Sequence, residues 1–208
     1  MTKIVIASML AMGMVSGAAY ADVTAQSGIY IGANAGWSFA DSPSASDASA
    51  SSVSNKNYVL GATVGYDYAF TQNWLAGLEI GYTYFGKQTY DYTGSQDGSF
   101  TNTGFQLMAT GTYLDSSGFN VFGKVGAVDE KTAVSDPSDN LGDTSQTKWL
   151  PAAAIGVGYM PMQNLNVALQ YERTFGASWS GTETSSDTPS KPMTQNAVTL
   201  GVTYKFGM

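Results

Sequence analysis

The chain of 208 residues has no cysteine and no histidine, and only 12 % of its residues are charged. Without cysteine it forms no disulfide and offers no thiolate to a metal ion. Without histidine it lacks the side chain best suited to proton transfer near neutral pH. About a quarter of the residues in an average domain are charged, so groups for acid–base chemistry are scarce. We therefore expect no enzyme, no cofactor and no metal site.

Positive charge is especially scarce. Nine lysines and arginines stand against sixteen acids, which gives a net charge of −7, and the sequence contains no basic run. Proteins that bind nucleic acids use clustered lysine and arginine side chains to neutralise phosphates. We therefore do not expect nucleic acid as a partner.

The N-terminus has the three parts of a secretory signal peptide. Lys3 supplies a positive charge, residues 4–15 form a short apolar core, and Ala19-Tyr20-Ala21 is an A-x-A cleavage site. The core is shorter than the roughly 20 apolar residues that a transmembrane helix needs. We predict a signal peptide at residues 1–21 and Sec-type export, with Asp22 as the first residue after cleavage.

Beyond residue 21 no apolar run is long enough for a transmembrane helix, and apolar residues alternate with polar ones instead. Alternation at every second residue indicates a β-strand with two different faces. The predicted strands are Ile29–Phe39, Tyr58–Phe70, Trp74–Phe85, Thr103–Leu114, Phe119–Val128, Lys148–Met160, Leu165–Phe175 and Gln195–Phe206. The sequence thus predicts an all-β fold with eight strands.

The connections between these strands alternate in length. Three are tight turns, and the other four are long and rich in Ser, Thr, Asp and Gly. The long loops are predicted at about 40–57, 86–102, 129–147 and 176–194. Short turns at one end and long loops at the other are typical of an antiparallel up-and-down barrel in an outer membrane. We predict this fold for residues 22–208.

One face of each strand is apolar, with aromatic residues towards its ends, as in a lipid-facing band with aromatic girdles. The predicted girdle comprises Trp37, Phe39, Tyr66, Trp74, Tyr82, Tyr84, Tyr113, Trp149, Tyr159, Tyr171, Tyr204 and Phe206. The opposite face is small, polar and glycine-rich, and we expect it to line the lumen. Its charged residues are Asp67, Glu79, Lys124, Glu172 and Lys205. Arg173 is the exception, because it lies on the apolar face near a loop.

A lipocalin-like soluble barrel is the alternative fold, because it also has eight strands and the same alternation. Its apolar face points inward around a ligand, and its other face meets water. The second face of this chain is too small and too rich in glycine for such an exterior. The membrane barrel is therefore the favoured interpretation.

Five segments carry a family resemblance: IYIGANAGWSF, LGATVGYDY, GLEIGYTYFG, FQLMATGTYL and AVTLGVTYKFG. In this order and spacing they resemble the OmpA-type outer-membrane barrel domain. The resemblance implies periplasmic termini and turns, four external loops, and contact with outer-membrane lipids, lipopolysaccharide and the barrel-assembly machinery. It implies a role in envelope integrity with at most a narrow ion-conducting pore. A peptidoglycan-binding domain, found in longer members, is not implied.

The resemblance also bears on the lumen charges. In that family two acids and two bases exchange partners as a gate, and Glu79 falls on one of the acids. The other three positions are Thr110, Gly158 and Ala168 here, so the exchange gate is not implied. Lys124 falls on another inward base. We predict that it is the main counter-charge of Glu79, because an unpaired buried charge costs several kcal/mol. Hydration of Glu79 by lumen water is the alternative.

The predicted loops carry most of the acids, Asp129 and Glu130 among them. The stretch DPSDNLGD at 136–143 lacks the ligand spacing and closing glutamate of a calcium loop, which favours a solvated acidic loop. Binding of a host or extracellular ligand through these loops, as in an adhesin, is the alternative function.

Overall fold

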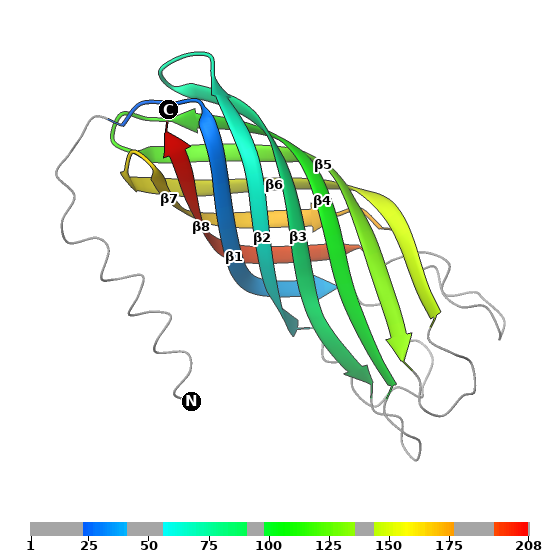
Figure 1. Cartoon of the computed structure of the whole chain (residues 1–208). Coiled ribbons are helices and arrows are strands. Elements are labelled where there is room, and N and C mark those ends of the chain that lie inside the picture. The colour runs from blue at the N-terminus through cyan, green and yellow to red at the C-terminus, as the bar shows by residue number, and fades with distance from the viewer. Residues whose placement is uncertain (1–22, 41–55, 91–97, 136–143, 177–193, 208) are drawn as a thin grey trace, which may run out of the picture.

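The computed structural model describes residues 23–40, 56–90, 98–135, 144–176 and 194–207. They form eight antiparallel strands in chain order, closed into a barrel by pairing of the first strand with the last (Figure 1). The strands are β1 (Gly28–Ala40), β2 (Lys56–Ala69), β3 (Trp74–Tyr90), β4 (Gly98–Leu114), β5 (Phe119–Ser135), β6 (Thr144–Met162), β7 (Leu165–Thr174) and β8 (Gln195–Gly207). The predicted fold class is confirmed.

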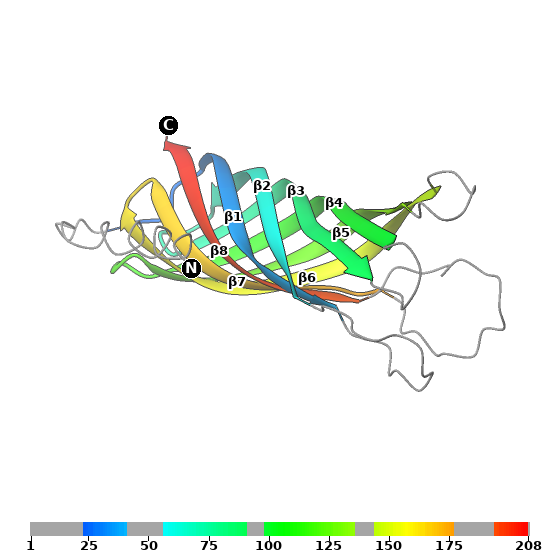
Figure 2. The ribbon, with the colours of Figure 1, turned by 90° about the horizontal axis from the view of Figure 1, so that it is seen from below.

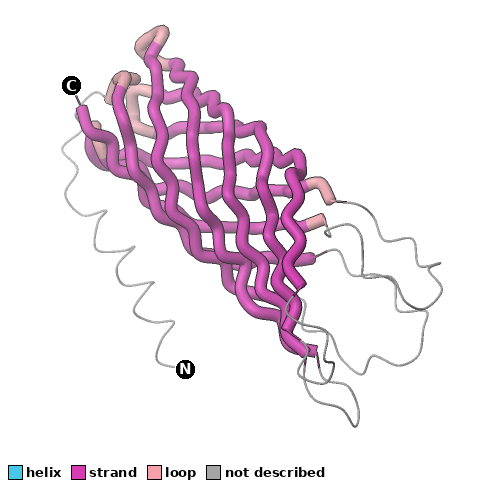
Figure 3. Tube along the Cα trace, turned by 45° about the vertical axis from the view of Figure 1, so that its right-hand side comes forward, coloured by secondary structure: helices cyan, strands magenta, loops and turns pink. Residues whose placement is uncertain are grey.

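The predicted signal peptide and the central part of each predicted loop lie outside the described residues. Within the described part, no helix is long and apolar enough to cross a membrane. The three tight turns and the C-terminal end of β8 lie at one end of the barrel, here called the turn end (Figures 2 and 3). The opposite end, where the predicted loops connect the strands, is here called the loop end.

Four neighbouring strands are longer than the sequence predicts. β3, β4 and β5 have 17 residues each and β6 has 19, whereas β7 has 10. Figure 1 shows the ends of β3 to β6 reaching furthest at the loop end. Residues 86–90, 98–102, 129–135 and 144–147, predicted as loop, are therefore strand. The prediction was wrong because the alternation fades where both faces of a strand are polar, while backbone pairing continues.

The turn between β4 and β5 shows how local sequence sets a tight connection. The backbone N–H of Gly118 donates to the carbonyl of Asp115 at 2.9 Å, and the Ser117 hydroxyl donates to the Asp115 carboxylate at 2.7 Å. This hydroxyl and the backbone N–H of Ser117 lower the pKa of Asp115 below its usual range. Gly118 has a φ of 85°, which glycine adopts without steric cost. A Cβ there would also lie 2.6 Å from the Met160 carbonyl oxygen.

The outer face of the barrel is apolar and the inner face is polar, as the alternation predicts. Large apolar side chains are exposed on the outer face, with Leu78 at 64 % and Val125 at 63 %. Buried polar side chains lie on the inner face, including Glu79 and Gln106. A lipocalin-like barrel would show the reverse arrangement, so that alternative is wrong.

The twelve predicted girdle residues all lie on the outer face, and all except Tyr84 are exposed. Tyr84 is half-buried and packs against Tyr58, with 6.0 Å between the ring centroids. Trp74 and Tyr113, which are paired across β3 and β4, make an edge-to-face contact at 5.1 Å. Such aromatic contacts contribute to the stability of the sheet.

Candidate functional site

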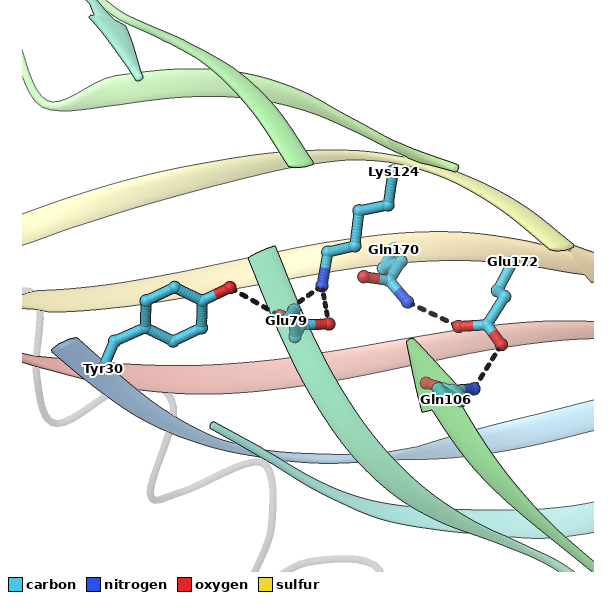
Figure 4. A network of polar contacts seen from close by, with 6 residues as sticks. All are labelled: Tyr30, Glu79, Gln106, Lys124, Gln170 and Glu172. Atoms are coloured by element: carbon cyan, nitrogen blue, oxygen red, sulfur yellow. Dashed lines mark hydrogen bonds and ion pairs between the residues drawn. The ribbon is translucent and has the colours of Figure 1, made fainter. Parts of the chain in front are cut away.

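The side chains of Tyr30, Glu79 and Lys124, which come from three non-adjacent strands, meet inside the barrel (Figure 4). Glu79 is 5 % exposed. Lys124 Nζ lies 2.7 Å from Glu79 Oε1 and 2.9 Å from Oε2. The Tyr30 hydroxyl donates to Oε2 at 3.0 Å. Glu79 belongs to β3, Lys124 to β5 and Tyr30 to β1, so the contacts cross the lumen. The carboxylate thus receives one cation and one neutral donor, which compensate its lost hydration.

Glycines on the neighbouring strands make room for this arrangement. Gly65 pairs with Glu79 across β2 and β3, and a Cβ at Gly65 would overlap the Tyr30 ring. A Cβ at Gly156 would likewise overlap the ring of Phe122. Inner-face glycines thus accommodate large lumen side chains at these positions. An eight-stranded barrel has just enough interior for side chains, so bulk at one position requires space at another.

A second buried carboxylate, Glu172 on β7, has a different environment. It is 8 % exposed and accepts hydrogen bonds from Gln106 Nε2 at 2.6 Å and from Gln170 Nε2 at 3.0 Å (Figure 4). Each carboxylate oxygen therefore has one amide donor. In the described part of the barrel Glu172 forms no ion pair. The hydrogen bonds that compensate its burial come from neutral donors.

Two further polar contacts lie towards the ends of the lumen. Near the turn end, Lys205 Nζ lies 2.7 Å from Asp67 Oδ2. Towards the loop end, Glu130 on β5 is 2 % exposed and accepts a hydrogen bond from Gln195 Nε2 at 2.7 Å. Glu130 and Asp129 were predicted as loop acids, and this is corrected by the structure, which places both in β5. Glu130 points inward because it continues the inner-face parity of Lys124.

The five predicted lumen charges thus fall into three groups. Glu79 lies with Lys124, Asp67 lies with Lys205, and Glu172 lies with amides. Sequence reasoning missed the neutral partners Tyr30, Gln106, Gln170 and Gln195. Their inner-face parity was available as a signal, but we searched that face for charges rather than for every hydrogen-bonding side chain.

A chamber of about 110 Å³ lies inside the barrel next to the Glu79 contacts. Its polar wall includes Asn34, Thr63, Thr110, Thr112 and Asn120. A space of this size lined by hydroxyls and amides suits water. The inner-face contacts can keep the charged side chains away from lipid, and the chamber can bind water. The described residues contain no group of three side chains suited to a metal ion.

Comparisons with known proteins agree with this architecture. The family model described as OmpA-like transmembrane domain matches residues 24–208. Outer membrane protein A of Serratia marcescens is 30 % identical over 154 residues, which cover 71 % of this chain but 39 % of that protein. The chain therefore spans about two fifths of the length of this relative.

Solved structures show the same fold at low sequence identity. Ail, the attachment invasion locus protein of Yersinia pestis, crystallised with the heparin analogue sucrose octasulfate, gives a TM-score of 0.52 at 18 % identity and covers 86 % of this chain and 97 % of its own. Neisserial surface protein A gives 0.52 at 16 % identity and covers 88 % and 100 %.

Proposed function

The chain belongs to the family of OmpA-like transmembrane domains, and from this premise we propose that it is an envelope-integrity protein of the bacterial outer membrane with a closed lumen. The observation that supports this role is the contact of Tyr30, Glu79 and Lys124 across the barrel. It joins three separate strands across the lumen, so we expect at most a narrow path for small ions.

We propose an orientation with both termini and the tight turns in the periplasm and the four loops outside. Export by a cleaved signal peptide at 1–21 and insertion by the barrel-assembly machinery would lead to this state. The exposed apolar outer face supports contact with hydrocarbon, and the aromatic residues near its ends suit the headgroup regions. Lipopolysaccharide would surround the loop end.

The closed lumen is tested by ion conductance. The refolded chain is inserted into planar bilayers, and we expect only small, brief currents from the intact protein. Lys124→Ala should increase conductance, because it removes the side chain that reaches Glu79 from β5. Lys131→Ala, at an exposed position of the same strand, is the matched control. Large, steady currents from the intact chain would contradict the proposal.

Location in the membrane has a separate test. An intact barrel in the outer-membrane fraction should migrate differently on a gel before and after heating, because the paired strands resist detergent until heated. A chain recovered from the soluble periplasm without this shift would contradict the membrane role altogether.

An adhesin is the second candidate function. The observation that favours it is the extension of β3 to β6 at the loop end, which raises two hairpins above the remaining strands. Ail shares the fold and was crystallised with a heparin analogue, although the likeness is in fold alone. Binding of cells that display the protein to host cells tests this function, because the acidic loops would repel a polyanion such as heparin. If binding occurs through the hairpin of β5 and β6, shortening the connecting residues 136–143 should abolish it.

A further inference from the structure

The residues just before β1 cross the turn end of the barrel. The backbone N–H of Val23 donates to the carbonyl of Ser116 at 3.2 Å, and that of Ala25 donates to the carbonyl of Gln72 at 2.8 Å. Ser116 lies in the turn between β4 and β5, and Gln72 in the turn between β2 and β3. In an eight-stranded barrel in chain order, β1 and β5 lie opposite one another. The segment 23–27 therefore spans the opening from one wall to the other (Figure 1).

The same segment is also held at its sides. Gln163, in the turn between β6 and β7, donates through Nε2 to the carbonyl of Thr24 at 2.6 Å. Ser27 Oγ accepts a hydrogen bond from the backbone N–H of Ala69 at 2.9 Å, at the end of β2. All three tight turns thus contact the segment. A segment that merely trailed from the first strand would not have a partner in every turn.

The segment buries an apolar side chain in the mouth of a polar lumen. Val23 is 6 % exposed and packs with Leu75 and Leu114, which are 5 % and 1 % exposed, while Met160 packs beside them. We call these four residues the apolar cap. Leu75, Leu114 and Met160 also line the chamber. Three of the four cap residues therefore form part of the chamber wall at the turn end.

We propose that segment 23–27 is a stopper that closes the turn end of the lumen by completing the apolar cap. Hydrophobic constrictions exclude water and ions because neither finds a polar partner there. This closure is separate from the charged contact around Glu79 and lies in series with it, so Lys124→Ala alone should raise the conductance less than Lys124→Ala combined with Val23→Ser. It goes beyond the proposed envelope role, since it assigns a sealing function to residues that belong to no strand.

The absence of cysteine allows a direct test. A single cysteine introduced at Thr112, which lines the chamber, reports on the entry of silver ions. Silver ions bind thiolates tightly and are similar in size to sodium ions. The refolded full chain is exposed to silver nitrate in chloride-free buffer for increasing times. The barrel is then unfolded by heat, and the remaining free thiol is labelled with a maleimide and scored by gel shift.

We expect slow reaction of Thr112→Cys in the otherwise intact chain. Adding Val23→Ser should speed the reaction about tenfold, which corresponds to about 1.4 kcal/mol off the barrier to entry. Leu114→Ser, which opens the same cap from the barrel wall, should have the same effect. Two variants on different elements keep the test usable if one of them fails to show the heat-dependent gel shift of a folded barrel.

Two controls separate sealing from general loosening. Gln26→Ser lies in the same segment, but its side chain is exposed, so the rate at Thr112→Cys should not change. Ser116→Cys, in an exposed turn, should react fast and equally in every background. Fast reaction of Thr112→Cys behind an intact cap would overturn the proposal. So would an unchanged rate in folded Val23→Ser and Leu114→Ser chains. A low conductance of the intact chain would stand in either case, because the Glu79 contact alone can supply it.

Discussion

Glu79 and Glu172 are two carboxylates in the same lumen, and they are buried to nearly the same extent. Different partners compensate the free-energy cost of burying each one. Glu79, at 5 % exposed, has a lysine and a tyrosine hydroxyl. Glu172, at 8 % exposed, has two glutamine amides. The first site depends on a charge supplied by another strand, and the second on neutral dipoles. Burial alone therefore does not predict which partner a lumen acid needs, and the two sites should respond differently to substitution.

The largest effect should come from removing the cation of the first site. Lys124→Met leaves Glu79 buried without a counter-charge and should lower the free energy of unfolding by about 3–5 kcal/mol. Urea titration of the barrel in lipid vesicles, followed by tryptophan fluorescence, measures it. Lys131→Met, at an exposed position of the same strand, is the control and should change stability little. Equal effects of the two variants would show that the ion pair does not stabilise the barrel.

The next effect should come from the glycine that admits the tyrosine to the first site. Gly65→Ala places a methyl group against the Tyr30 ring and should cost about 1–3 kcal/mol through overpacking. Gly111→Ala is the matched control, because a Cβ at Gly111 has nothing within 4 Å. The same urea titration compares them. A barrel that tolerates both alanines equally would argue against tight packing around Tyr30.

A smaller effect is expected from the second site when one amide is lost. Gln106→Leu removes one of the two donors to Glu172 and should cost about 1 kcal/mol, near the lower end for a buried group that loses a partner. Gln170 still serves the other carboxylate oxygen. Unfolding in urea measures the loss. A cost as large as that of Lys124→Met would mean that the amides are as essential as the cation.

The smallest effect should come from neutralising the second carboxylate itself. Glu172→Gln keeps the shape but turns one acceptor oxygen into an NH2 donor, which a flip of one neighbouring glutamine amide can satisfy. Because it also removes a buried charge that has no ion pair, it should change stability by less than about 1 kcal/mol. Glu79→Gln makes the same change where a lysine is left behind, and should destabilise by more. Reversal of this order in urea titrations would erase the distinction between the two sites.

The alternation of apolar and polar residues was sufficient to predict eight strands, their order, and the inner position of all five predicted charges. It could not predict the length of β3 to β6, because a paired strand in water needs no apolar face. Glu130 was missed for the same reason, since it lies in such an extension. Which inner-face charges pair across the lumen depends on how far neighbouring strands are shifted along each other. An alternating pattern within one strand does not determine this shift. The contacts of residues 23–27 depend on three turns far apart in sequence.

Pairing of β1 with β8 runs from Gly28 opposite Gly207 to Ala40 opposite Gln195. This seam joins the two most distant parts of the barrel sequence, so its formation requires the largest loss of chain entropy on folding. Before it closes, two rows of backbone N–H and C=O groups would face hydrocarbon without partners, which a bilayer does not tolerate. We therefore expect insertion and closure of this seam to occur together.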